Sequence, residues 1–154
     1  MKVLRSLALS ALVAGLASAA LSDPAGDAAV GARQSLMRLQ TFFAGQLGQM
    51  AQGKVPYDAK MATIAANDLE AVTSMDITPM FPAGTDNGAY PKSHALPAIW
   101  TGMDDFMSKY ADMHKATLAM QAAAGGGLDG LKAAAGPVFA ACGACHKEYR
   151  APLN

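Results

Sequence analysis

The sequence has 154 residues and a balanced charge, with 12 basic and 12 acidic side chains. This balance argues against a nucleic-acid-binding protein, which would need a clear excess of lysine and arginine. Only 6% of the residues are aromatic, whereas alanine, methionine and glycine are abundant. Such a composition favours helices over β-sheet.

The N-terminus has the three parts of a secretory signal peptide. Lys2 and Arg5 form a short positive region, residues 7–16 are apolar, and residues 17–19 read Ala-Ser-Ala, a small-residue cleavage site. We therefore expect residues 1–19 to be removed on export.

The remainder, residues 20–154, is short enough to form one domain. Loss of the two N-terminal cations leaves 10 basic against 12 acidic residues, a net charge of −2. The apolar part of the signal is too short to span a membrane, and no other stretch approaches the required length. We expect an exported protein without a membrane segment, most simply in a bacterial periplasm.

Two helices are predicted in the first half of this domain. The first runs from about Asp23 to Ala51, because Asp23 can cap it, and because Gly53 and Pro56 both stop helices. Its buried face is predicted from apolar residues spaced by three and four: Leu36, Leu39, Phe43, Leu47 and Met50. The second helix begins at Asp58. Its apolar spacing is less regular: Met61, Ala65, Leu69, Val72 and Met75.

Residues 77–93 are predicted to form a long loop, because they contain three prolines and two glycines. Long loops in compact domains are usually functional or mobile. A third helix should start between Ser93 and Pro97 and continue to about Ala124. Its apolar seam has no interruption: Ile99, Met103, Phe106, Tyr110, Met113, Thr117 and Met120.

The glycines at 125–127 predict a tight break before the fourth helix. This helix has a regular seam: Leu128, Leu131, Ala135, Val138, Cys142, Cys145 and Tyr149. Pro137 lacks an amide hydrogen, so the firm part of the helix is expected to begin near Gly136. Four amphipathic helices with two short links and one longer central link predict an all-α fold, an antiparallel four-helix bundle.

The fourth helix carries Cys142-Gly-Ala-Cys145-His146, the attachment signal for a c-type haem. Cysteines three residues apart lie on one helix face, so both thiols can reach the vinyl groups of one porphyrin. His146 follows directly and can bind the iron. Because both cysteines fall on the seam, we expect the haem to lie inside the bundle.

Other interpretations of the two cysteines are weaker. A thioredoxin-like pair needs a βαβ context, and the sequence shows no strand pattern. A zinc site needs four ligands, but His94 and His114 have no paired spacing. A disulfide across one helical turn would strain the backbone. Both histidines are expected at the surface, and Asp104-Asp105 is expected on a solvated helix face, since no nucleophile accompanies them.

With this motif at the end of the fourth helix, the mature chain resembles the cytochrome c′ family, the class II c-type cytochromes. Four segments match in order: residues 33–37 (Arg-Gln-Ser-Leu-Met), 50–58, 81–86 with 98–100, and 142–150. The resemblance implies a covalent haem c on Cys142 and Cys145, with His146 as the proximal ligand.

The resemblance also implies neighbours of the haem. Arg33 and Gln34 would lie near the propionates, and a guanidinium suits a carboxylate. The less favoured alternative, if the resemblance is set aside, is that Arg33 decorates a solvated face. The other implied neighbours are three loop residues and one at the end of the fourth helix, in the proximal pocket: Phe81, Thr85, Asp86 and Arg150.

Met37 decides between two functions. If its sulfur binds the iron, as in some class II cytochromes, the haem is six-coordinate and low-spin and the protein is a dedicated electron carrier. If Met37 only packs on the distal face, the iron is five-coordinate and largely high-spin and takes nitric oxide or carbon monoxide. Residues 33–37 and 81–85 look more like the five-coordinate members, so we expect the open site with some electron exchange with redox partner proteins.

An enzyme, such as a peroxidase or a nitric oxide reductase, is not expected, because the sequence offers no distal His/Arg pair and no second metal site. Members of the family commonly form dimers through the first two helices. Leu39, Phe42 and Phe43 are the candidates for such a contact in a homodimer.

Overall fold

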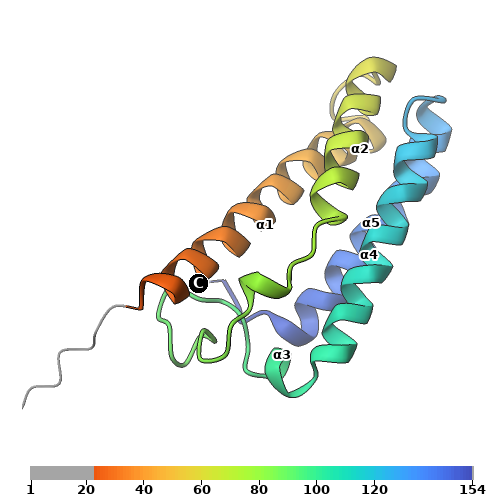
Figure 1. Cartoon of the computed structure of the whole chain (residues 1–154). Coiled ribbons are helices and arrows are strands. Elements are labelled where there is room, and N and C mark those ends of the chain that lie inside the picture. Colours follow the sequence, from red (N-terminus) through yellow and green to blue (C-terminus); the bar gives the residue numbers. More distant parts are fainter. Residues whose placement is uncertain (1–22, 154) are drawn as a thin grey trace, which may run out of the picture.

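The computed structural model describes residues 23–153, so the expected signal peptide lies outside the described residues. Its elements are α1 (Pro24–Ala51), α2 (Ala59–Thr73), the 3-10 turn η1 (Thr78–Met80), α3 (Ala98–Thr101), α4 (Met103–Ala123) and α5 (Leu128–Tyr149). The four long helices form an antiparallel bundle, in which α1 packs against α2 and α4 against α5 (Figure 1). The predicted fold class is confirmed.

Helices α1 and α2 begin where their capping residues predict. Asp23 Oδ1 accepts a hydrogen bond from the amide of Ala25 at 3.1 Å, and Asp58 Oδ1 accepts one from the amide of Met61 at 2.9 Å. Gly53, with a φ of 70°, lies in the turn between the two helices. Glycine adopts this left-handed conformation without a steric penalty, which fixes the turn.

The predicted buried faces of α1 and α2 are wrong in part. Leu39, Met61 and Met75 are 46%, 46% and 45% exposed. On α1, the inward position is taken by Gln40, whose amide reaches the Tyr110 hydroxyl at 3.5 Å. On α2, the buried face is built mainly from small residues: Ala62, Ala65, Ala66 and Leu69. The prediction was wrong because a hydrophobicity pattern gives little weight to alanine and glutamine as buried residues. Either side chain can nevertheless fill a closely packed helix interface.

The predicted third helix is divided at Gly102, where the backbone has φ −134° and ψ 42°. The amide of Gly102 closes α3 on the carbonyl of Ala98, and its own carbonyl accepts the amide of Phe106 to open α4. A Cβ at position 102 would lie 3.3 Å from the Ala98 oxygen, so glycine suits the break. The predicted seam faces inward: its residues are buried, except for half-buried Met103.

Helix α5 is continuous from Leu128, so the expected start near Gly136 is wrong. Pro137 lies inside the helix and cannot donate to the carbonyl of Ala133. Both residues are exposed, and the carbonyl that loses its partner therefore faces solvent. The helix continues because this one lost bond costs little where water can replace it.

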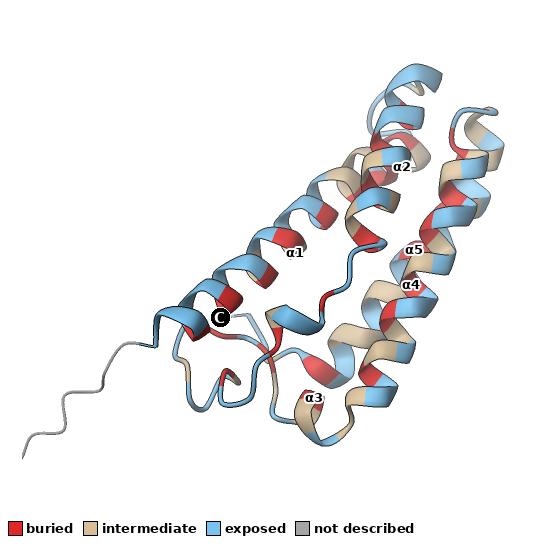
Figure 2. Cartoon of the chain, in the orientation of Figure 1, coloured by how far each residue is buried: buried red, intermediate tan, exposed pale blue. Residues whose placement is uncertain are grey.

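Buried residues recur along the length of the long helices (Figure 2). Among the described residues they form two main clusters, one toward each end of the bundle. The alanine cluster lies toward the α1–α2 and α4–α5 turns; its buried members include Ala62, Ala65, Ala66, Ala124, Ala135 and Leu131. The aromatic cluster lies toward the other end; its buried members include Phe81, Ile99, Phe106, Tyr110 and Tyr149. Among residues 23–153, no helix combines the length and apolarity needed to cross a bilayer.

Candidate functional site

The two cysteines project from the last turns of α5 toward different parts of the core. Cys142 packs against the alanine cluster and Cys145 against the aromatic cluster, and both are half-buried free thiols. Burial raises the pKa of Cys142 and raises that of Cys145 to about 11. Both thiols are therefore neutral near pH 7. A redox-active pair usually contains a thiol of lowered pKa, so the thioredoxin-like interpretation loses support.

His146 follows Cys145 and is half-buried. Burial lowers the pKa of its imidazole, and the nearby positive charge of Arg150 lowers it further. A neutral imidazole keeps one ring nitrogen free of a proton, as iron ligation requires. Arg150 itself is exposed at the end of the helix.

These three residues fit the haem predicted from the sequence. The thiols stand one helical turn apart, at the junction of the two core clusters, and a neutral imidazole lies beside them. Within residues 23–153 there is no group of three or more His, Cys, Asp or Glu side chains that could hold a metal ion. A structural zinc site is therefore not supported in this part of the chain.

Arg33 lies on α1 and is only 5% exposed, so the solvated-face interpretation is wrong. One terminal nitrogen donates to the Met80 carbonyl at 3.0 Å and to the Thr85 hydroxyl at 2.9 Å. The other donates to the Ser93 hydroxyl at 2.8 Å and to the Thr85 carbonyl. The guanidinium thereby binds three separate points of the connection between α2 and α3.

Aromatic rings flank the same guanidinium. Its central carbon lies 5.1 Å from the centroid of the Phe81 ring and 6.0 Å from that of Trp100. The Trp100 indole donates to the backbone carbonyl of Phe81 at 3.1 Å, which holds the indole beside the main chain of that residue. Burial lowers the pKa of Arg33, while the negative charge of Asp86 opposes that shift.

Gln34, Thr85 and Asp86, which were also expected near the haem, make hydrogen bonds within the protein. Gln34 donates its side-chain amide to the Lys92 carbonyl at 2.6 Å. The Thr85 hydroxyl donates to the Pro82 carbonyl at 2.8 Å. Asp86 Oδ1 accepts the amides of Gly88 and Ala89 and so fixes a turn within the loop. These polar groups have partners in the protein itself.

Met37 lies on α1, one turn after Arg33, and is half-buried against the aromatic cluster. Cys145 packs against the same cluster from α5, and Phe81 belongs to it from the loop. The fold thus brings Met37, Phe81 and Cys145 together from three distant parts of the sequence.

Sequence reasoning missed a polar contact that holds the last turn of α5. The Tyr149 hydroxyl donates to Asp105 Oδ2 on α4 at 2.6 Å, and Lys109 lies 3.4 Å from both Asp105 and Glu148. The hydrogen bond lowers the pKa of Asp105 and is the main cause that raises the pKa of Tyr149 to about 12. The seam spacing signalled that Tyr149 is buried, but nothing in the sequence identified its partner 44 positions earlier.

The histidines differ from each other. His94 is exposed, as expected. His114, expected at the surface, is half-buried, and its Nε2 lies 2.9 Å from Glu70 Oε1. This contact joins α4 to α2. A second contact between the same two helices is the Thr73–Thr117 pair, whose hydroxyl oxygens are 2.7 Å apart.

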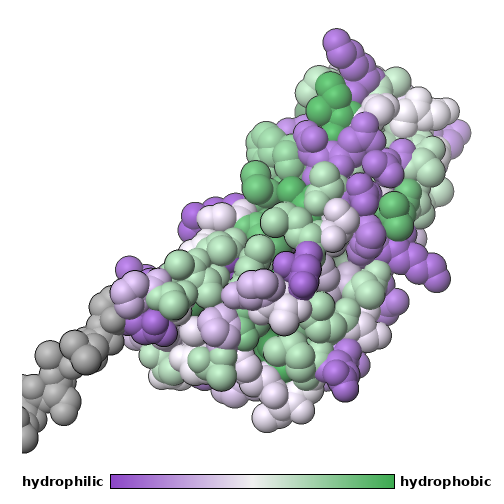
Figure 3. Space-filling model, in the orientation of Figure 1, coloured by the Kyte–Doolittle hydropathy of each residue, from purple (hydrophilic) through white to green (hydrophobic). Residues whose placement is uncertain are grey.

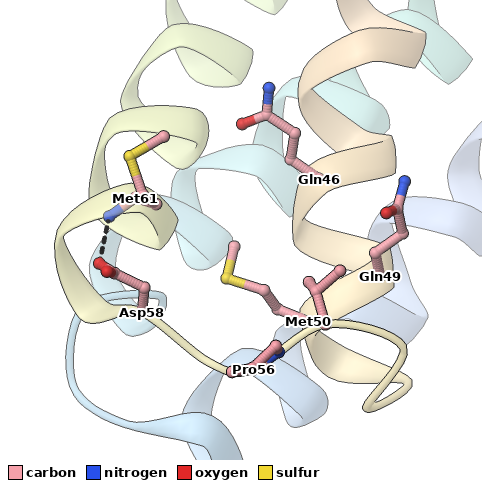
Figure 4. A pocket seen from close by; sticks show the side chains of 7 residues that line it. Gln46, Gln49, Met50, Pro56, Asp58 and Met61 are labelled. Atoms are coloured by element: carbon pink, nitrogen blue, oxygen red, sulfur yellow. Dashed lines mark hydrogen bonds between the residues drawn. The ribbon is translucent and has the colours of Figure 1, made fainter.

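A cavity of about 280 Å³ opens between the end of α1 and the start of α2, at the end of the bundle opposite Arg33. Figure 4 shows Met50 and Met61 beside it, with Gln46 and Gln49 on α1; Asp58 is engaged as the α2 cap. None of the predicted site residues lines this cavity. The cavity is therefore lined by other residues than those predicted to hold the haem.

Comparison with known proteins identifies relatives over most of the chain. The family model described as Cytochrome C' matches residues 28–150. Cytochrome c-554 from Cereibacter sphaeroides is 45% identical over 118 residues, which cover 77% of this chain and 89% of that protein.

Solved structures show the same fold. Cytochrome c′ from Rhodobacter Spheriodes superposes with a TM-score of 0.81 at 33% identity, over 86% of this chain and all of that one. A nitric oxide complex of a cytochrome c prime variant from Alcaligenes xylosoxidans superposes with a TM-score of 0.74 at 30% identity, over 86% of this chain and all of that one.

Proposed function

The chain belongs to the cytochrome c′ family, and we propose that it carries one haem c attached through Cys142 and Cys145, with His146 as the proximal ligand. The family consists of non-enzymatic haem proteins and implies a covalent haem c. The observation that carries the proposal is the pair of half-buried neutral thiols on one face of α5, beside a neutral imidazole. When bound, the group supplies a redox-active iron that can take a small axial ligand.

We propose an open distal position, at which nitric oxide or carbon monoxide binds, together with electron exchange with redox partner proteins. In this proposal Met37 packs on the distal face without ligation, and the aromatic cluster excludes water from that side. The nitric oxide complex of the Alcaligenes relative supports this function. Arg33 and Gln34 are proposed to reach the propionates while they keep their bonds to the loop, and Arg150 is proposed to line the proximal side.

A second candidate is a six-coordinate electron carrier with Met37 as the sixth ligand. Two observations favour it. The Met37 side chain lies against the same cluster as Cys145, and Met37 is carried by α1, which packs against α5. A thioether is a good sixth ligand and raises the reduction potential.

The visible absorption spectrum of the purified mature protein, oxidised and then reduced with dithionite, separates the two candidates. An open site gives a broad reduced band and an unchanged spectrum in Met37→Ala. Sharp, separated reduced bands that convert to a high-spin spectrum in Met37→Ala would establish the second candidate. Met107→Ala is the matched control, because Met107 is also half-buried against the aromatic cluster. Absence of any haem band would overturn both.

We also propose that residues 1–19 direct export and that the domain of residues 20–154 works in the periplasm, where members of this family typically occur. A protein that stays in the cytoplasmic fraction after cell fractionation, with residues 1–19 still attached, would contradict this.

A homodimer through α1 is proposed from its exposed apolar residues. Leu39 is 46% and Phe42 is 59% exposed, and apolar surface is visible along the upper half of α1 (Figure 3). Phe43 packs partly into the alanine cluster, with its ring edge-on to Phe42 at 5.3 Å. Sedimentation of wild type and Phe42→Glu tests the contact. A wild-type protein that stays monomeric at high concentration would remove it.

A further inference from the structure

The connection from Met80 to Leu96, here called the strap, is hydrogen-bonded to three residues at the beginning of α1: Arg33, Gln34 and the capping residue Asp23. Arg33 holds it at Met80, Thr85 and Ser93, as described above. Gln34 holds it at Lys92. The Tyr90 hydroxyl donates to the Asp23 carbonyl at 3.2 Å, at the start of the helix. The strap therefore follows the first three turns of α1 up to the turn that carries Met37.

The last part of the strap is bound instead to the chain that follows His146. The Leu96 amide donates to the Tyr149 carbonyl at 3.0 Å, and the Ala151 amide donates to the His94 carbonyl at 2.8 Å. Ala95 and Arg150 form an isolated antiparallel bridge. Two segments 55 positions apart (95 and 150) thus pair like a minimal sheet directly beyond the proximal histidine.

Ser93 joins these two sets of contacts. Its hydroxyl oxygen accepts from Arg33 at 2.8 Å and from the Ala95 amide at 3.1 Å, and Ser93 is only 4% exposed. A continuous series of hydrogen bonds consequently leads from Arg33 through Ser93 to Ala95, which pairs with Arg150. Charge-assisted bonds to a rigid, planar guanidinium fix direction as well as distance, and burial strengthens them.

We propose that Arg33 is a positioning residue that acts through Ser93 to align residues 93–96 with the end of α5. In this way it couples the α1 turn that carries Met37 to the α5 turn that carries His146. Disturbance of α1 at Arg33 then loosens the bridge between Ala95 and Arg150 at the end of α5. The relevance of this coupling to the iron rests on the proposed function; the coupling itself does not.

Hydrogen exchange of backbone amides in the intact protein tests the coupling. Ser93→Ala removes the shared hydroxyl, and Arg33→Lys replaces the planar fork by a single point charge. Both are expected to speed exchange of the Leu96 and Ala151 amides about tenfold, the order expected when a charge-assisted hydrogen bond is lost. Arg38→Lys, an exposed arginine on the same helix, is the matched control and should change neither amide.

Two results would overturn the proposal. In the first, exchange rises only between residues 80 and 93, so that Arg33 acts on the loop alone. In the second, the Met113 amide in α4 accelerates as much as Leu96, so that the variants merely destabilise the whole bundle. A visible spectrum recorded on the same samples reports separately on the iron site: a missing haem band would contradict the proposed function, while the amide rates would still decide the coupling.

Discussion

The two ends of the bundle are built from the same four long helices but pack by different means. At the alanine-cluster end the helices meet through small side chains, and Tyr57 fastens the two turns: its hydroxyl donates to the Ala124 carbonyl at 2.8 Å and accepts the Gly127 amide at 3.0 Å. At the other end, aromatic rings separate the helices; Phe106 lies 4.9 Å from Phe81 and 5.3 Å from Tyr149 between ring centroids.

This difference indicates which end of the bundle surrounds the proposed haem site. Small side chains bring the helix backbones close together in the alanine cluster, whereas large rings and the buried Arg33 guanidinium hold the helices apart at the aromatic end. Arg33, Met37 and Cys145 all lie toward the aromatic end. We therefore expect substitutions at the aromatic end to change both stability and the haem spectrum, and substitutions in the alanine cluster to change stability alone.

The largest expected effect is complete loss of covalent haem when Cys142 and Cys145 are both changed to alanine, because no thioether can then form. The mass of the denatured mature protein should fall by one haem relative to wild type. Retention of covalent haem in the double variant would contradict the assignment. Single variants are the internal control, since each keeps one thiol on the same helix face.

Phe106→Ala should destabilise the protein by about 3–5 kcal/mol, because a buried ring that contacts two other rings is removed. It should also shift the haem spectrum, since it loosens the aromatic end. Urea unfolding followed by circular dichroism measures the first effect, and visible absorption at low urea the second. If Phe106→Ala lost the expected stability but kept a normal haem spectrum, the aromatic end would not be the part of the bundle that shapes the haem site.

Ala66→Leu should cost about 1–3 kcal/mol, because Ala66 is fully buried and the alanine cluster has no space for a larger side chain. The haem spectrum should stay unchanged. Ala119→Leu is the matched control on α4, since Ala119 is exposed and tolerates the added volume. A spectral change in Ala66→Leu as large as that in Phe106→Ala would remove the proposed difference between the ends.

The smallest effect is a pH dependence at the Tyr149–Asp105 contact. The hydrogen bond lowers the pKa of Asp105 below its ordinary 3.8, so the ionised carboxylate favours the folded state. This contribution is fully present above pH 3.8 and disappears as the pH falls through the lower folded pKa. Unfolding curves of Tyr149→Phe and wild type should therefore converge in acid.

Local rules explain which features were predictable. The starts of α1 and α2 follow from Asp23 and Asp58, whose carboxylates accept amides one turn away, and the attachment motif uses residues three apart on one helix. Each of these interactions is complete within about one turn. Sequence spacing is enough to identify it.

Other features depend on partners far along the chain. Leu39 fits an apolar pattern, yet it is exposed because Gln40 meets Tyr110, 70 positions away. Helix α5 passes through Pro137 because that face points to solvent.

The sequence by itself determined four amphipathic helices, the caps of α1 and α2, the haem motif and the residues that face inward on α4 and α5, because these depend on periodicity and short-range chemistry. Only the tertiary structure decided that Arg33 is buried, that it binds Met80, Thr85 and Ser93, and that the strap pairs with the chain after His146. Those contacts bring together segments 47 to 60 residues apart. No spacing rule connects such segments, so their position is fixed only when the helices pack.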